Sequence, residues 1–248
     1  SWVYPVSDTT NGGSVLFRVR NLTIDANGGF NADGRGYQSG RGPGKGADSS
    51  SIGSGGGGYG GQGGNSYFSG TWAGGSPYGW SNAPVHPGSA GGDADYGGPG
   101  GGLVRIETSG DVVLNGTVTA NGGRSMSGQY YGGGGSGGSI FIRCDDFSGG
   151  GSAWLKATGG IADQYTGGGG GGRIAVWDRV APMMVDRILD GERLQELRIT
   201  NSHSRYLGSV SVAGGSAGAP PGNSDPGLGG TVLFLSCDPP RGTVLIAM

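Results

Sequence analysis

"GGSIFIRCDDFSGGGSAWLKATGG" (residues 137–160) contains the pattern on which the fold prediction depends. It opens with Gly-Gly, continues as an alternating apolar strand, crosses a corner of small residues and closes with a strand that ends in Ala-x-Gly-Gly. "GGLVRIETSGDVVLNGTVTANGG" (101–123) has the same layout, and looser copies occur at 12–34, at 171–177 with 208–215, and at 229–248. Five copies of about 20–24 residues are typical of a solenoid in which each copy forms one coil.

The spacing of apolar residues within each copy predicts which side chains point inward. Residues two apart in a strand share one face of a sheet. The inward residues predicted for the first strands are Phe17, Val104, Ile106, Ile140, Ile142, Ile174, Val176, Val232 and Phe234. Those predicted for the closing strands are Phe30, Val118, Leu155, Val210 and Val244, followed two residues later by Ala32, Ala120, Ala157, Val212 and Ile246. The sequence therefore predicts an all-β fold, a parallel right-handed β-helix of about five coils with equivalent side chains in columns.

Glycine accounts for 63 of the 248 residues. This composition alone is compatible with a disordered chain, but disorder does not predict the common register of the five copies. Glycine-rich segments at 35–100, 124–136, 161–170 and 214–228 separate the copies, and each ends just before a first strand. Because glycine has no Cβ, such runs can pack backbone to backbone in extended, polyproline-like ladders, or make sharp corners through positive φ. We predict a stacked layer of these runs, the alternative being flexible linkers.

The organisation expected is a single domain over residues 1–248. Two segments within it depart from the repeat: a glycine- and aromatic-rich lobe at 35–100 and a charged insertion at 181–207. The insertion is expected to form a small satellite with a helix before Gly191, then a second short helix or a hairpin. Outward positions of the first strands are also apolar, so we expect the lobe or a neighbouring molecule to cover them. These outward residues are Leu16, Phe141, Trp177, Leu233 and Leu235.

Charge and composition exclude several classes of function. The net charge of −2 gives no electrostatic basis for binding nucleic acid or an anionic membrane. No apolar run is long enough for a membrane span. The two cysteines, Cys144 and Cys237, are expected to be free thiols, with Cys144 buried.

No residue pattern predicts a catalytic, metal or cofactor site, and we expect the protein not to be an enzyme. Asp145 and Asp146 fall at a predicted corner, where aspartate favours turns. His86 and His203 have no partner at metal-ligand spacing and are predicted to be surface residues.

Four glycine motifs together resemble a known type of sequence. They are "ADGRGYQSGRGPGKG" (32–46), "GGGGYGGQGG" (55–64), "GGGGSGGSIFI" (132–142) and "GGGGGGRIAVW" (167–177). In this order they resemble the glycine-rich β-helical repeat region of large secreted or surface proteins of environmental bacteria. The resemblance covers about residues 12–180 and implies an extracellular β-helical module with no assigned activity. It supplies no catalytic residues.

The function expected from these features is structural: an extracellular or cell-surface protein that assembles with copies of itself. Both ends of the predicted solenoid are apolar and lack a polar cap, which invites stacking end to end into a filament or surface layer. The residues expected to make that contact are Trp2, Val3, Tyr4, Val244, Leu245, Ile246 and Met248.

Two other functions remain open. The first is an adhesive module for glycans or surfaces, possessing an aromatic platform in the glycine-rich lobe and an extracellular polysaccharide as partner. The platform residues are Tyr59, Tyr67, Trp72, Tyr78, Trp80 and Tyr96. The second is a polysaccharide lyase or hydrolase built on a β-helix.

Overall fold

The computed structural model describes residues 1–38, 40–49, 52–68, 70–93, 95–126, 131–180, 182–190, 197–220 and 222–237. These residues are mostly strands and extended chain, with one short helix near the C-terminal end. In chain order the elements are β1 (Trp2–Val3), β2 (Leu16–Val19), β3 (Leu22–Ile24), β4 (Gly29–Asn31), β5 (Leu103–Thr108), β6 (Asp111–Leu114), β7 (Thr117–Thr119), β8 (Ser139–Cys144), β9 (Asp146–Gly149), β10 (Trp154–Lys156), β11 (Arg173–Asp178), α1 (Pro182–Leu189), β12 (Leu197–Thr200), β13 (Ser209–Ser211) and β14 (Thr231–Cys237).

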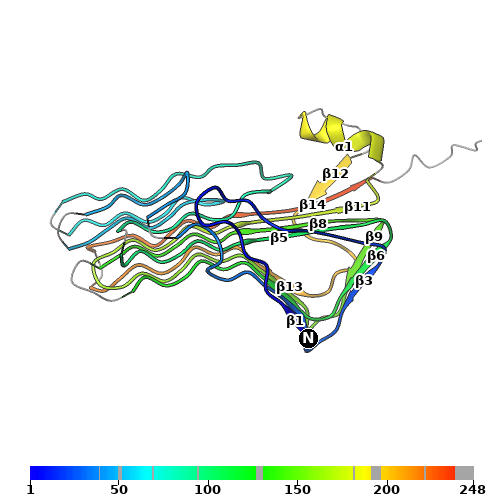
Figure 1. Cartoon of the computed structure of the whole chain (residues 1–248), viewed down its shortest axis with the longest axis horizontal. Coiled ribbons are helices and arrows are strands. Elements are labelled where there is room, and N and C mark those ends of the chain that lie inside the picture. The colour runs from blue at the N-terminus through cyan, green and yellow to red at the C-terminus, as the bar shows by residue number, and fades with distance from the viewer. Residues whose placement is uncertain are drawn as a thin grey trace, which may run out of the picture.

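The strands belong to three sheets (Figure 1). Sheet A has five strands in the order β1-β4-β7-β10-β13, sheet B has six in the order β12-β14-β11-β8-β5-β2, and sheet C has three in the order β3-β6-β9. Neighbouring strands run parallel, except that β12 pairs antiparallel with β14. Most neighbours are separated in sequence by long crossover connections. Here those connections contain strands of the other sheets and glycine-rich segments in place of the usual helix.

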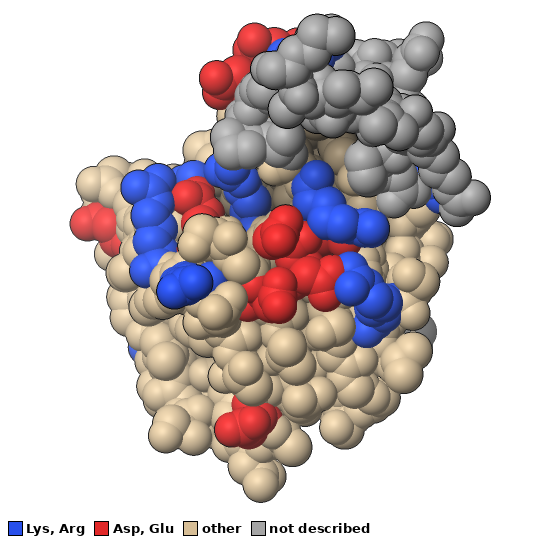
Figure 2. Space-filling view, turned by 90° about the vertical axis from the view of Figure 1, so that its right-hand side faces the viewer, with Lys and Arg blue, Asp and Glu red and all other residues tan. Residues whose placement is uncertain are grey.

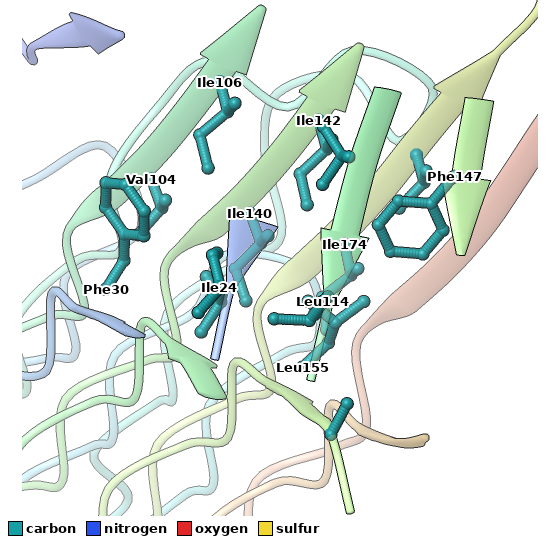
Figure 3. Packing of buried hydrophobic residues seen from close by; sticks show 14 of the residues in the cluster. Ile24, Phe30, Val104, Ile106, Leu114, Ile140, Ile142, Phe147, Leu155 and Ile174 are labelled. Carbon is teal, nitrogen blue, oxygen red and sulfur yellow. The ribbon is translucent and has the colours of Figure 1, made fainter. Parts of the chain in front are cut away.

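The predicted columns of apolar side chains are present. Phe30 is paired with Val118, Val118 with Leu155, and Leu155 with Val210 along sheet A. Val104, Ile140, Ile174 and Val232 are paired in the same way along sheet B. All three sheets contribute to one buried core, where residues such as Phe147 and Leu114 of sheet C meet the isoleucines of sheet B (Figure 3). Val244 and Ile246 lie outside the described residues.

The prediction of a parallel β-helix of about five coils is wrong. The strands form three separate sheets of unequal length, sheet B is mixed, and the sheets do not close into a solenoid. Sheet C receives strands only from the first three copies. The physical reason lies in the fourth copy, where α1 and β12 follow β11 in place of a middle strand. Sheet C was not predicted either. Its short strands β3, β6 and β9 lie where corners of small residues were expected in the first three copies.

The glycine-rich runs form a hydrogen-bonded bundle that extends away from the sheets (Figure 1). Within the run 133–138, amides three residues apart donate to the same neighbouring segment. Gly134 and Gly137, for example, donate to the carbonyls of Gly167 and Gly170. The other pairs of this run are Gly133 and Ser136 to Gly92 and Ser89, and Gly135 and Gly138 to Gly123 and Ala120. A period of three is that of the polyproline II helix, so each run bonds to neighbours on three sides.

Close packing of these chains requires glycine. A Cβ built on Gly169 would lie 1.9 Å from the carbonyl oxygen of Gly135, closer than any side-chain atom can approach. The prediction of polyproline-like ladders is therefore confirmed for the described segments, and the alternative of flexible linkers is wrong there. The glycine run before a strand is a structural element that continues directly into that strand.

The outward face of sheet B is covered by two segments. Ala83 and Val85 of the glycine-rich lobe pack there together with Ile188 of α1, against Phe141 and Trp177. This confirms the expected cover by the lobe and the expected helix before Gly191. In the second half of the insertion, Leu197–Thr200 form β12, which adds to the edge of sheet B beside β14. Residues 191–196, where a second helix or a hairpin was expected, lie outside the described residues.

Candidate functional site

In the described part of the chain, the side chains that could bind a metal ion lie apart from one another. No group of three or more His, Cys, Asp and Glu side chains lies close enough together there to hold a metal ion. Within the same part of the chain, no helix is long and apolar enough to cross a membrane. Cys144 is a buried free thiol, as predicted, and burial is the main cause that raises its pKa. Cys237 is buried as well, which was not predicted.

His203 is not the isolated surface residue predicted. Its side chain is only 7% exposed, and its Nε2 lies 3.1 Å from Oδ2 of Asp178, a carboxylate that is fully buried. Arg179 Nε donates to the same oxygen over 3.2 Å. Asp178 and His203 lie 25 residues apart and on different segments, so no local sequence pattern could have indicated this contact.

Acidic and basic side chains gather on one end of the molecule. Figure 2 views the end that carries sheet C, where acidic side chains occupy the middle of the face and Lys and Arg surround them. One ion pair of sheet C joins Asp146, which begins β9, to Arg205, and both side chains are partly exposed. Asp178, which bonds Arg179, is buried beneath the surface.

Two of the six aromatic residues of the predicted platform pack inside the molecule. Tyr59 is fully buried, and its ring lies 4.7 Å from the ring of Tyr78. The Tyr59 hydroxyl is 2.6 Å from the Ser139 hydroxyl. Arg173 donates to the carbonyls of both tyrosines, which joins the lobe to the start of β11. These residues attach the lobe to sheet B.

The other four aromatic residues lie apart from this pair. Tyr67 donates a hydrogen bond to Asp225, and Trp72 bridges to Ser66 through the backbone. The Tyr96 carbonyl accepts a bond from Met126, and its side chain is half-buried. Trp80 is the most open of the six, at 62% exposed. Glycan binding by the six residues as one platform stays a prediction.

Trp80 lies at a groove on the outward face of sheet B, which we call the Trp80 groove. Its volume is about 330 Å³, and it lies between the lobe, sheet B and α1. The floor includes Phe141 and Trp177, whose rings meet edge to face with centroids 5.3 Å apart. The Trp177 indole donates to the Asn82 carbonyl over 2.7 Å, and this bond holds the segment that carries Trp80. Its lining also includes Trp80, Val85, Arg105, Glu107, Arg143 and Leu189.

A row of charged residues crosses one side of the Trp80 groove. Arg18, Glu107 and Arg143 occupy neighbouring positions on β2, β5 and β8. Glu107 accepts from Arg105 Nη2 over 2.7 Å and from Arg18 Nε over 3.0 Å. Burial alone acts to raise the pKa of Glu107, but these two bonds outweigh it and lower the pKa below its usual value. This row was not among the predicted sites, although an alignment of the outward positions of the repeats places the three residues side by side.

The N-terminal segment forms a second distinct surface. β1, β2 and β3 are each the last strand of their sheet, and all three come from the first 24 residues. Six large apolar residues of this segment are exposed: Trp2, Val3, Tyr4, Val6, Val15 and Val19. We call this set, with the free edges of β1, β2 and β3, the N-terminal edge surface. The expected contact residues Val244, Leu245, Ile246 and Met248 lie outside the described residues.

Comparison of the chain with known protein families, curated proteins and solved structures finds no match. The resemblance of its glycine motifs to repeat regions of secreted bacterial proteins therefore stays a prediction.

Proposed function

We propose that the protein is a structural module that associates with a second copy of itself through the N-terminal edge surface. The observation that carries this proposal is that three sheets end there together: among the described residues, β1, β2 and β3 each pair with another strand on one side only. An open strand edge offers unpaired N–H and C=O groups to another strand, and natural proteins usually cover or charge such edges. Here the edge carries exposed Trp2, Val3 and Val19 beside the charged side chain of Arg18 on β2.

The opposite end of sheet B is built differently. Its last strand is β12, which pairs antiparallel with β14 through four residue pairs from Leu197 to Thr200. A head-to-tail stack that continued the parallel order of sheet B would need a parallel strand at both ends of that sheet. The geometry therefore favours a symmetric pair, in which the same surface of both copies meets, over an open filament. An extracellular or cell-surface setting agrees with the resemblance of the glycine motifs and is part of this proposal.

Sedimentation equilibrium over a wide range of protein concentration tests the proposal. We expect the native chain to form a dimer and Val19→Lys to shift it to a monomer, because a charge on the edge must be desolvated when strands pair. Leu207→Lys is the matched control, since Leu207 is 72% exposed and lies outside the N-terminal segment. A native chain that stays monomeric at every concentration contradicts the proposal, as does equal dimerisation of the two variants.

A further inference from the structure

The Trp80 groove combines apolar walls with cationic side chains. Val85, Phe141, Val185 and Leu189 line it, from the lobe, β8 and α1. Trp80 and Leu189 remain 62% and 40% exposed although both lie against this face. Exposed apolar surface inside a concave site is a usual feature of small-molecule binding sites.

Positive charge exceeds negative charge in this groove. Arg105 and Arg143 both line it, and Glu107 is the carboxylate among its lining residues. Glu107 is already bonded by Arg105 and by Arg18. Among the residues that the structure describes, Arg143 has no ion-pair partner. Arg105 in addition has a buried Nε atom without a hydrogen-bond partner. A buried donor left unpaired is costly, and an anionic ligand nearby reduces that cost.

The chemistry of the lining restricts the kind of anion. Its polar side chains are those of Arg105, Glu107 and Arg143, and the rest of the lining is aromatic or aliphatic. A sugar carries many hydroxyl groups, each of which needs a hydrogen-bond partner when buried. An organic acid with an apolar body needs partners only for its carboxylate. The Trp80 indole offers a flat surface to that body, and the guanidinium of Arg143 matches a carboxylate in geometry.

We propose that the Trp80 groove binds a small organic anion, a carboxylate attached to an aromatic or aliphatic body. The carboxylate lies at Arg143 and Arg105, and the apolar body lies against Trp80 and the side chains of Val85 and Leu189. This site is separate from the N-terminal edge surface, so the two proposals can fail independently.

Calorimetric titration of the full chain with 2-naphthoate tests the proposal. The neutral 2-naphthamide, of nearly the same shape, is the ligand control, and glucuronate tests an acidic sugar. We expect saturable binding of naphthoate at one site per chain, with the amide at least tenfold weaker and glucuronate weaker than naphthoate. Arg143→Gln and Trp80→Ala should each reduce naphthoate affinity about tenfold or more, which is the effect of losing one charge-assisted bond or one aromatic contact.

Two control variants show whether binding belongs to this groove. Arg20→Gln removes an exposed arginine that does not line it, and Val19→Lys alters the N-terminal edge surface. Both should bind naphthoate as the native chain does. The proposal is overturned by equal affinity for the amide, by unchanged binding in Arg143→Gln, by loss of binding in Val19→Lys, or by glucuronate binding more tightly than naphthoate.

Discussion

At the scale of single residues, buried tyrosines and one arginine join the lobe to the sheets. The rings of Tyr59 and Tyr78 pack against each other at an angle of 56°, and the Arg173 guanidinium lies 5.4 Å from the centre of the Tyr59 ring. Arg173 is itself 7% exposed. Burial is the main cause that raises the pKa of Tyr59, to about 12, and it also raises the pKa of Tyr78 and of Tyr206. These hydroxyls thus stay protonated in the folded protein at pH values where free tyrosine ionises.

We predict that the folded protein loses stability above about pH 10, where tyrosines in the unfolded chain ionise. The native state then binds more protons than the unfolded state, so the free energy of unfolding falls as pH rises from about 10 toward the raised pKa values. The slope from each such tyrosine is on the order of 1.4 kcal/mol per pH unit. Urea denaturation between pH 8 and 11 measures this loss.

Absorbance at 295 nm over the same pH range provides the direct control. Of the 10 tyrosines, Tyr59, Tyr78 and Tyr206 should not titrate before the protein unfolds. Tyr59→Phe should lose stability less steeply with pH than the native chain. Titration of all tyrosines near pH 10, with native circular dichroism retained, would contradict the prediction.

At the scale of elements, the glycine runs behave as packed structure. Gly169 lies where a Cβ would meet the backbone of Gly135 at 1.9 Å, whereas the nearest atom to a Cβ on Gly229 is the Val212 carbonyl oxygen at 3.7 Å. We predict that Gly169→Ala lowers the free energy of unfolding by about 1–3 kcal/mol or more, because the neighbouring chain must move. Gly229→Ala should be neutral, or stabilising by about 0.4–1 kcal/mol. Urea denaturation of both variants compares them, and equal midpoints would contradict the prediction.

The sequence predicts a strand correctly where each repeat has an apolar side chain at the same position. It does not predict strands that lack such a repeated position. Val118, Leu155 and Val210 could be aligned because each repeat places an apolar residue at the same step, and they are paired in sheet A. In sheet C, β9 reads Asp-Phe-Ser-Gly, residue types that mostly favour turns, so its segment was interpreted as a corner. The pairing of β12 with β14 depends on a long-range contact that no local pattern marks.

The candidate site was less predictable than the columns. Trp80 and Tyr59 both occur in glycine-rich segments, yet Trp80 is 62% exposed and Tyr59 is fully buried. Nothing in a glycine run fixes which way an aromatic side chain turns, because the neighbouring residues have no side chains to set a register. Arg105 and Arg143, in contrast, lie on strands. The period of two predicts which face of the sheet they occupy, but it does not predict which segment covers that face.

At the scale of the whole molecule, backbone hydrogen bonds join the glycine bundle to the ends of the sheets. The run 133–138 continues directly into β8, and Gly138 donates to the carbonyl of Ala120, the residue after β7. Gly172, just before β11, likewise donates to Ala157 after β10. A bundle that opened would release these bonds at the ends of sheets A and B together. The molecule is therefore expected to unfold as one unit.

We predict that amides of the bundle exchange with deuterium as slowly as those of the central strands. Gly134 and Gly137 in the bundle and Ile140 and Ile142 in β8 should show similar free energies of opening, because both sets open only by global unfolding. Native-state hydrogen exchange at increasing urea concentration measures these values. Gly169→Ala should lower them equally in the bundle and in β8. A bundle that exchanges at much lower free energy than β8, or a variant effect confined to the bundle, would show instead that the glycine runs form a separate, less stable unit.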